Sequence, residues 1–496
     1  MSAPALLDNA ELRVVEQRFR DASPPLMERA GIAAARLAAS IAGEGSGPIV
    51  VVAGPGNNGG DAWVAAQHLA QSFHRVTVFD VTGIPPRAAE AVAARASFVA
   101  AGGTVVREWP ATVRASLVID GVLGIGSTRA PDGAIAAAIE RINASRSRVL
   151  ALDVASGIDA DTGVARGAAV RADDTITFIA MKPGLFTGDG VEHSGVVHLD
   201  DLGMELEAAR GMLLEWENVR AWLAPRGVNS HKGSHGTLAI VGGAPGMAGA
   251  AILAARAALR TGAGKVLVGI YDERAPAFDP EAPELMLRKP ADVLDADVVV
   301  AGPGGGSCPI ASAVLALAKP IVLDADALND LAASATLRLA IKARTAATIL
   351  TPHPGEAARL LATDTKSIQA DRVASALRMA AEFNAHVVLK GAGSVVAHPD
   401  GTYAINTTGN PGLASGGTGD ALAGMIGAML CQGLDAPRAL AFAACLHGAA
   451  ADSCVARGIG PVGLTASDVI LEARALLNLK SQGERRPPQI NTDKRR

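Results

Sequence analysis

The chain has 496 residues, of which 49% are hydrophobic, and its formal net charge is −4. This length indicates two or three domains with enough apolar material for large cores. A small net charge without a dominant basic tract argues against nucleic acid as the main partner. The apolar runs are short, and the N-terminus lacks a basic region followed by an apolar one, so we expect neither a membrane span nor a signal peptide.

Aromatic residues make up only 3% of the chain. Ala, Val, Leu and Ile must therefore fill the cores, which favours layered α/β domains over sandwiches. The four cysteines form no C-x-x-C pair, and we expect them to be reduced, mostly buried thiols of a cytoplasmic protein. They are Cys308, Cys431, Cys445 and Cys454.

The first half of the chain alternates apolar strands with helices. Helical spacing predicts helix up to about Gly43, and the wholly apolar run 48–53 predicts a strand buried on both faces of a parallel sheet. A Gly-rich turn, 54–61, follows, and the next helix is predicted to begin at Ala62. Further strands are predicted at 76–80, 117–120, 149–153, 175–178 and 196–199. This pattern predicts a Rossmann-like three-layer domain.

Three carboxylates follow or end strands of this predicted sheet. They are Asp61, Asp120 and Asp153. Because ligands of open α/β sheets bind at the carboxyl ends of the strands, we expect these side chains to converge on one crevice.

The region from about 202 to 227 is more polar and lacks the alternation, so it is interpreted as a linker. Strands then resume, and a second α/β domain is predicted. Its strands are expected at 237–243, 266–270, 298–301, 321–326, 348–351 and 386–389, with helices at 247–254 and 421–430. The tail from about Ser481 is polar and basic and is predicted to be disordered.

The turn from Asn57 to Asp61 supplies amides, glycines and a carboxylate in five residues. Asn58, Asp120 and Ser156 could also give hard oxygen ligands to a cation. One alternative is a simple turn with Asp61 as a helix cap. A second is a redox Rossmann site, since 54–59 fits G-x-G-x-x-G, but a carboxylate at the helix start would repel a pyrophosphate.

The stretch from Gly416 to Asp420 combines glycines with one carboxylate and runs into an apolar helix. Free N–H groups and the helix dipole suit a phosphate there, and Asp420 is placed to move a proton. The alternative is that Asp420 only caps the helix.

Three other positions are weighed against structural roles. His353 lies between two prolines that rigidify its turn. The segment from Lys390 to Ser394 could be a glycine flap over a nucleotide or merely a hairpin turn. Asp153 could move protons on a bound ring or could be a buried carboxylate bonded to backbone N–H groups.

Taken together, these motifs resemble the bifunctional NAD(P)H-hydrate repair enzymes of the YjeF family. In the first half the resemblance is carried by G-P-G-N-N-G-G-D at 54–61, the loop 124–129 and D-x-x-S-G-I-D at 153–159. In the second half it is carried by H-K-G at 231–233, G-P-G at 302–304, T-P-H-P-G-E at 351–356, K-G-A-G-S at 390–394 and G-G-T-G-D at 416–420. The resemblance implies a YjeF N-terminal epimerase domain at 1–215, a ribokinase-like dehydratase domain at 220–480 and a tail at 481–496.

For the first domain, the resemblance implies epimerisation of R- and S-NADHX and NADPHX, the hydrated forms of the cofactors, with Asp153 as a catalytic residue. Potassium would be held by Asn58, Asp120 and Ser156. The hydrate would be bound by Asn57, Asn58, Gly59, Gly60, Asp61, Gly124, Ile125, Gly126, Ser127, Thr128, Arg129, Ala130 and Asp153.

For the second domain, it implies dehydration of the S epimer at the expense of ADP or ATP with magnesium, with Asp420 catalytic. The hydrate would face Ala250, Gly304, Gly305, Gly306, His353 and Asp420. The nucleotide would face Lys390, Gly391, Ala392, Gly393, Ser394 and Gly419. The resemblance also implies a homo-oligomer.

Two other functions remain open from the residues alone. A ribokinase-type kinase of a small alcohol would explain the second domain but leaves the first idle. A scaffold that binds nucleotide without turnover would give Asp420 no chemical role.

Overall fold

The computed structural model describes residues 3–43, 47–86, 88–110, 114–127, 129–206, 209–307 and 311–479. The predicted tail, Thr128 and Cys308 lie outside these ranges. The chain forms two compact units. The first comprises Met1–Asn218, Ala311–Ala318 and Ala327–Thr407, and the second comprises Val219–Ile310, Lys319–Asp326 and Thr408–Arg496.

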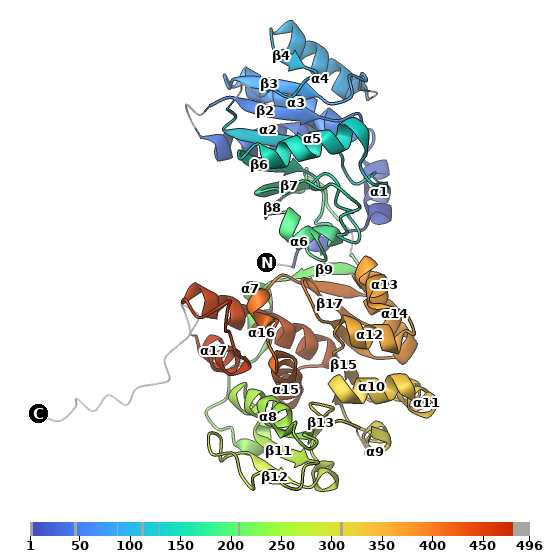
Figure 1. The fold of residues 1–496 in the computed structure, drawn as a ribbon, viewed down its shortest axis with the longest axis vertical. Helices are drawn as coiled ribbons and strands as arrows, with labels where there is room; N and C mark the ends of the chain where they lie inside the picture. The colour runs from blue at the N-terminus through green and yellow to red at the C-terminus, as the bar shows by residue number, and fades with distance from the viewer. Residues whose placement is uncertain are drawn as a thin grey trace, which may run out of the picture. The chain divides into compact units, whose positions relative to one another are not determined.

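A seven-stranded parallel sheet forms the N-terminal part of the first unit (Figure 1), in the order β4-β3-β2-β5-β6-β7-β8. Its strands are β2 (Ile49–Ala53), β3 (Val76–Asp80), β4 (Thr104–Val106), β5 (Leu117–Gly121), β6 (Arg148–Leu152), β7 (Asp174–Phe178) and β8 (Val196–Asp200). The four central strands are almost wholly buried, as the continuous apolar runs predict.

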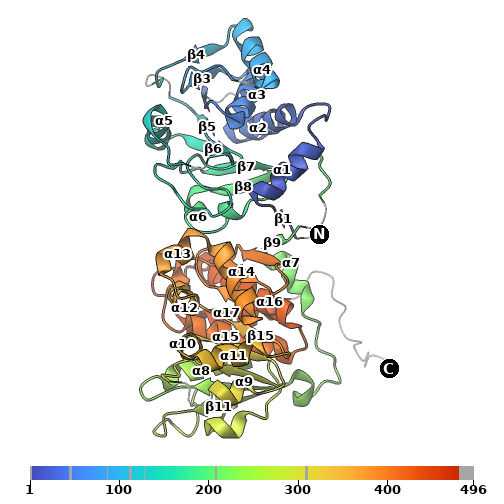
Figure 2. The same cartoon turned by 90° about the vertical axis from the view of Figure 1, so that its right-hand side faces the viewer.

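Helices cover both faces of this sheet. One face carries α2 (Leu26–Ala42), α3 (Asn57–Gln71) and α4 (Ala89–Ala100), and the other carries α5 (Gly133–Ala144), as Figure 2 shows. Alternate residues of β2 point to opposite faces of the sheet. Val51 packs toward α2 and α3, whereas Val52 packs toward α5. The predicted Rossmann-like three-layer arrangement is confirmed.

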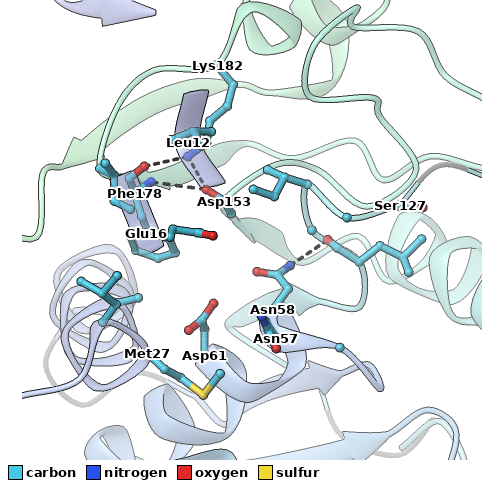
Figure 3. A pocket seen from close by; sticks show the side chains of 18 of the residues that line it. Leu12, Glu16, Met27, Asn57, Asn58, Asp61, Ser127, Asp153, Phe178 and Lys182 are labelled. Atoms are coloured by element: carbon cyan, nitrogen blue, oxygen red, sulfur yellow. Dashed lines mark hydrogen bonds and ion pairs between the residues drawn. The ribbon is translucent and has the colours of Figure 1, made fainter. Parts of the chain in front are cut away.

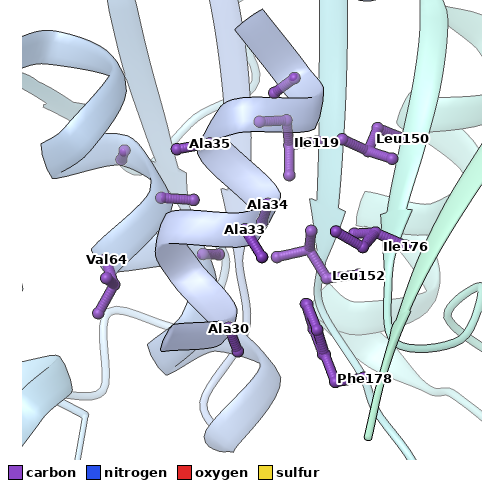
Figure 4. Close-up of a cluster of buried hydrophobic side chains, with 14 of the residues drawn as sticks. Ala30, Ala33, Ala34, Ala35, Val64, Ile119, Leu150, Leu152, Ile176 and Phe178 are labelled. Carbon is purple, nitrogen blue, oxygen red and sulfur yellow. The ribbon is translucent and has the colours of Figure 1, made fainter. Parts of the chain in front are cut away.

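Small residues let α2 approach the sheet closely (Figure 4). Ala30, Ala33 and Ala34 pack against a set of larger strand residues. These are Ile119, Leu152, Ile176 and Phe178. Short elements complete this part of the unit: α1 (Asn9–Arg18), η1 (Pro183–Leu185) and α6 (Gly190–His193).

A further set of six strands in the first unit runs in the order β1-β9-β18-β17-β16-β15. They are β1 (Ala5–Leu6), β9 (Gly211–Leu214), β18 (Tyr403–Asn406), β17 (Ser394–Ala397), β16 (His386–Leu389) and β15 (Thr348–Leu350). The helices here are α9 (Ala311–Leu315), α10 (Ala325–Ala333) from its third residue on, α11 (Ala335–Lys342), α12 (Pro354–Leu360), α13 (Thr365–Ala370) and α14 (Arg372–Phe383).

The interpretation of 202–227 as a plain linker is wrong. Strand β9 pairs in parallel with β18, with Gly211 opposite Tyr403, and antiparallel with β1. The apolar run Met212-Leu213-Leu214 is too short to show alternation, yet Leu213 and Leu214 are buried by these neighbours. The turns α7 (Trp216–Val219) and η2 (Arg220–Trp222) follow.

The second unit contains five parallel strands in the order β14-β13-β10-β11-β12. They are β14 (Ile321–Leu323), β13 (Val298–Ala301), β10 (Thr237–Gly242), β11 (Lys265–Ile270) and β12 (Met286–Arg288). Its helices are α8 (Ala248–Arg260), α15 (Thr418–Cys431), α16 (Ala436–Ala456) and α17 (Ala466–Asn478), with short turns η3 (Lys232–His235), η4 (Pro290–Val293) and η5 (Pro411–Leu413). The predicted α/β class is confirmed for this half too.

Among the described residues, α16 is the one helix long and apolar enough to cross a membrane by length and composition. Its most apolar window is 72% buried inside the protein. That burial is typical of a core helix, which α16 forms with α15 and α17.

Candidate functional site

A cavity of about 540 Å³ lies at the carboxyl ends of the central strands in the first unit (Figure 3). The loops after β2, β5, β6 and β7 all contribute to it, as expected for a parallel α/β sheet. Its polar lining consists of Arg13, Glu16, Asn57, Asn58, Asp61, Ser127, Asp153 and Lys182. The expected convergence of Asp61, Asp120 and Asp153 on one crevice is confirmed for Asp61 and Asp153, whereas Asp120 is fully buried and is not among the described residues that line the cavity.

Helix α3 begins at Asn57, not at Ala62, and its N-cap is Gly56. The glycines make this early start possible. A Cβ atom at Gly59 would lie 1.9 Å from the Gly54 carbonyl oxygen, and one at Gly60 would lie 2.6 Å from Met27 Cε. The interpretation of Asp61 as a helix cap is wrong, because Asp61 lies five residues into α3 and its side chain faces the cavity.

Asp153 occupies a left-handed backbone conformation, with φ of +64°, directly after β6. Its carboxylate pairs with Lys182, whose Nζ donates to Asp153 Oδ1 at 2.5 Å. The same Nζ donates to Thr177 Oγ1 at 2.8 Å and to the Phe178 carbonyl oxygen at 2.7 Å. An αL position is costly for a non-glycine residue, so this strained turn marks Asp153 as a functional candidate.

Lys182 is a cavity residue that sequence reasoning missed. Its side chain is 1% exposed, and three acceptors compensate for the burial of its charge. The signal available in the sequence was a lysine four residues after a buried strand and directly before Pro183-Gly184.

The carboxyl groups of Asp61 and Asp153 lie in different electrostatic surroundings. Burial raises the pKa of Asp61 well above its usual range, and the charges of Asp153 and Glu16 raise it further, while Lys182 opposes the shift. The protonated form of Asp61 is therefore favoured, whereas Asp153 is ion-paired with Lys182. Two carboxyl groups in different surroundings within one cavity can serve as an acid and a base.

The three predicted cation ligands are linked by hydrogen bonds beside the cavity, because Asn58 and Ser156 both contact Leu123 and Ser156 contacts Asp120. Ser156 Oγ donates to Asp120 Oδ1 at 2.7 Å, and Ser156 N donates to Asp120 Oδ2 at 2.9 Å. Asn58 Nδ2 donates to the Leu123 carbonyl oxygen at 2.7 Å, while Asn58 Oδ1 is buried and has no hydrogen-bond partner among the residues that the structure describes. Because buried polar atoms are normally paired, this orphan oxygen, on a residue that shares Leu123 with Ser156, fits an oxygen-coordinated cation.

The remaining predicted residues of the first half divide into three groups. Gly124, Ile125, Gly126 and Ser127 line the cavity, as do Asn57 and Asn58. Arg129 and Ala130 are exposed and are not among the described residues that line it. Gly59 and Gly60 are buried in helix packing, so their predicted contact with the hydrate stays a prediction.

In the second unit, Gly419 and Asp420 lie in the first turn of the 14-residue helix α15. The N-cap is Gly417, at φ of +90°, so the interpretation of Asp420 as the cap is wrong. A glycine-rich turn that enters a helix leaves N–H groups directed outward, which suits a phosphate or another anion.

Ala250 and the loop 304–306 also come together in the second unit. A Cβ atom at Gly304 would lie 2.9 Å from Ala250 Cβ. Gly306 N donates to Asp326 Oδ2 at 2.8 Å, which fixes the loop. The loop glycines have positive φ at Gly304 and Gly306, whereas Gly305 does not.

His353 and the segment 390–394 belong to the first unit. His353 is the N-cap of α12, and its Nδ1 accepts from Gly355 N at 3.0 Å. Lys390 N donates to the Pro352 carbonyl oxygen at 2.9 Å, so the two predicted elements are adjacent. Residues 390–394 form the turn of the antiparallel β16–β17 hairpin.

The fold and the cavity thus define a two-part α/β protein with a polar cavity on a Rossmann-like sheet and a glycine-rich helix start in its second half. Residues 23–184 match the family described as YjeF-related protein N-terminus, and residues 238–471 match the family described as NAD(P)H-hydrate dehydratase.

Full-length relatives extend the match. The bifunctional NAD(P)H-hydrate repair enzyme Nnr of Escherichia coli (strain K12) is 40% identical over 472 residues, which cover 91% of this chain and 89% of the relative. The enzyme of the same name from Coxiella burnetii is 37% identical, covering 87% of this chain and 90% of the relative. The chain belongs to the family of bifunctional NAD(P)H-hydrate repair enzymes, as the sequence motifs predict.

Among solved structures, an ADP/ATP-dependent NAD(P)H-hydrate dehydratase from Bacillus subtilis, co-crystallised with ATP and Mg²⁺, is 33% identical. The similarity covers 53% of this chain and 97% of that one, with a TM-score of 0.48. A ribokinase-like superfamily protein from Enterococcus faecalis is 24% identical, with a TM-score of 0.48 and coverage of 55% of this chain and 98% of that one.

Proposed function

We propose that this chain repairs hydrated nicotinamide cofactors by two reactions. The first half interconverts the R and S epimers of NADHX and NADPHX, and the second half dehydrates the S epimer with ADP or ATP. The observation that carries the proposal is that Asp61, whose pKa is raised by burial, and Asp153, which is ion-paired with Lys182, line one cavity of a chain that belongs to this family.

Epimerisation must break and re-form a bond at the ring carbon that carries the hydroxyl group. Asp61 can supply a proton because its folded-state pKa is raised, and Asp153 can accept one. Lys182 fixes the Asp153 carboxylate through a 2.5 Å contact and keeps it aimed into the cavity. The loop 124–127 and Asn57 then orient the hydrate.

Asn58, Asp120 and Ser156 would hold the potassium ion of this half. When bound, the ion supplies a fixed positive charge that balances the buried Asp120 carboxylate. The chain itself orders the ligands, because Ser156 N and Oγ both donate to Asp120.

In the second half, the N-terminal turn of α15 would stabilise the phosphoryl group as it transfers from the nucleotide to the hydroxyl oxygen of the hydrate. Asp420 would take the hydroxyl proton. The phosphate would then leave with the oxygen, a ring proton would be lost, and the reduced cofactor would be restored. Residues 390–394 would bind the nucleotide, and magnesium would enter with it. The cytoplasmic location and the homo-oligomer stay predictions.

Purified protein mixed with both NADHX epimers and ADP tests the proposal by the absorbance of the reduced cofactor. We expect complete recovery that requires nucleotide. Recovery of one epimer alone would show an inactive first half. Absence of any nucleotide-dependent recovery would reject the proposal, and phosphorylation of a small alcohol instead would favour a kinase.

A further inference from the structure

Arg372, the first residue of α14, is a buried cation with an unusual set of partners. Its side chain is 1% exposed. It donates to the carbonyl oxygens of Leu389, Lys390 and Gly393 at 3.2 to 3.5 Å. It also donates to Gln369 Oε1 at 2.5 Å and Thr187 Oγ1 at 3.0 Å.

None of these acceptors is a carboxylate. Burial lowers the pKa of Arg372 to about 10, which reflects the cost of placing the charge there. A buried charge is retained when its hydrogen bonds fix something that packing alone would not. Here three of the acceptors belong to the 389–393 backbone, so the fixed structure is the turn of the β16–β17 hairpin.

The glycines of this turn fit between Arg372 and a segment of the first half. Gly391 has φ of +138°, and a Cβ atom there would lie 2.9 Å from both terminal nitrogens of Arg372. Gly393 has φ of +60°, and a Cβ atom there would lie 1.7 Å from the Phe186 carbonyl oxygen. Both φ values favour glycine, and a side chain at Gly393 would also collide with the Phe186 backbone.

Thr187 completes the arrangement from the N-terminal segment. It is fully buried, and its hydroxyl group accepts from Arg372 Nε and lies 3.2 Å from the Gly393 carbonyl oxygen, to which it can donate. Thr187 follows η1, which begins directly after Lys182 of the cavity. Residues 1–218 and 327–407 belong to one compact unit, so these contacts lie within it.

We propose that Thr187 and Arg372 are positioning residues for the nucleotide-binding turn 390–394, so that a residue of the epimerase segment sets the nucleotide affinity of the dehydratase. This inference rests on the proposed function, which assigns the nucleotide to that turn. It also gives a physical reason for the fusion of the two activities in one chain, because the turn is shaped from both sides.

The test measures the KM for ADP, the KM for the hydrate and kcat in Thr187→Val. We expect the KM for ADP to rise about tenfold, as for loss of a hydrogen bond to a charged group, with the KM for the hydrate unchanged. Thr187→Ser should restore the wild-type KM. Thr175→Val is the matched control, because Thr175 is equally buried and its hydroxyl donates to the Ser194 carbonyl oxygen instead.

An unchanged KM for ADP in folded Thr187→Val would overturn the inference, as would an equal rise in Thr175→Val. If Thr187→Val does not fold, Arg372→Lys decides, with the same expected rise and the same contrary result. Titration calorimetry with ADP alone gives the affinities even without turnover. Wild-type protein that binds ADP but repairs no hydrate would contradict the proposed function only, whereas wild-type protein that binds no ADP would overturn this inference too.

Discussion

Asp61 is a side chain whose chemistry is set by its position rather than its type. It lies one turn inside α3, where burial and the charges of Asp153 and Glu16 favour its protonated form. On the solvent side of the same helix, the same residue would be an ordinary ionised surface group. The proposed acid role thus follows from the helix starting at Asn57.

The raised pKa of Asp61 makes the stability of the protein depend on pH in a defined direction. The folded-state pKa of Asp61 lies above its pKa in the unfolded chain. The stabilisation that comes from its protonated form is therefore fully present below the unfolded pKa. It is lost as pH rises through the folded pKa, by at most about 1.4 kcal/mol per pH unit. In Asp61→Asn this dependence is removed. The melting temperature of the variant should therefore rise relative to that of the wild type as the pH increases from acidic to neutral.

Scanning calorimetry across a series of buffers measures this difference in melting temperature. Asp173→Asn is the control, because Asp173 is exposed and lies outside the cavity. A constant difference in melting temperature between wild type and Asp61→Asn at every pH would mean that Asp61 titrates normally.

Single residues also show where sequence reasoning stops. Asp153, Asn58 and Ser156 stand in recognisable motifs and could be predicted as site residues. Lys182 stands 29 residues from Asp153 and enters the cavity only because β7 pairs with β6. No local pattern encodes such a contact, since it depends on which strands become neighbours.

At the scale of elements, strands made of continuous apolar runs were predictable almost to the residue. The prediction of 48–53 and the observed β2 (Ile49–Ala53) differ by one residue. The strands β1 and β9 were not predictable, because they have two and four residues and β9 finds its parallel partner in β18, far along the chain. The start of α3 was misplaced because glycine and asparagine have low helix propensity, so the run Asn57-Asn58-Gly59-Gly60 does not indicate helix from the sequence.

Glycine at a helix contact leads to a stability prediction. A Cβ atom at Gly424 in α15 would lie 2.0 Å from the Ala254 carbonyl oxygen in α8. Gly424→Ala should therefore destabilise the protein by about 1–3 kcal/mol despite the better helix propensity of alanine. Gly249→Ala in α8 is the control, because a Cβ atom there meets nothing within 4 Å. Thermal unfolding measures both, and equal melting temperatures would show that the helices separate without cost.

At the scale of the molecule, the predicted boundary between 215 and 220 stays a prediction. The N-terminal sheet and the strands from β15 to β18 share one compact unit, and the helix start that carries Asp420 belongs to the other. The motif order along the chain was enough to predict the family. The hydrogen bond between Thr187 and Arg372 could not be predicted, because it depends on how distant segments come together in three dimensions.

The central claim is that one chain carries two separable activities, and Asp420→Asn tests it most directly. Given pure S-NADHX and ADP, the variant should lose at least ~100-fold of the nucleotide-dependent recovery of reduced cofactor, as expected for loss of a general base. It should still form the R epimer at the wild-type rate, which chromatography of the two epimers measures. Undiminished recovery, or simultaneous loss of epimer interconversion in a folded variant, would contradict the account.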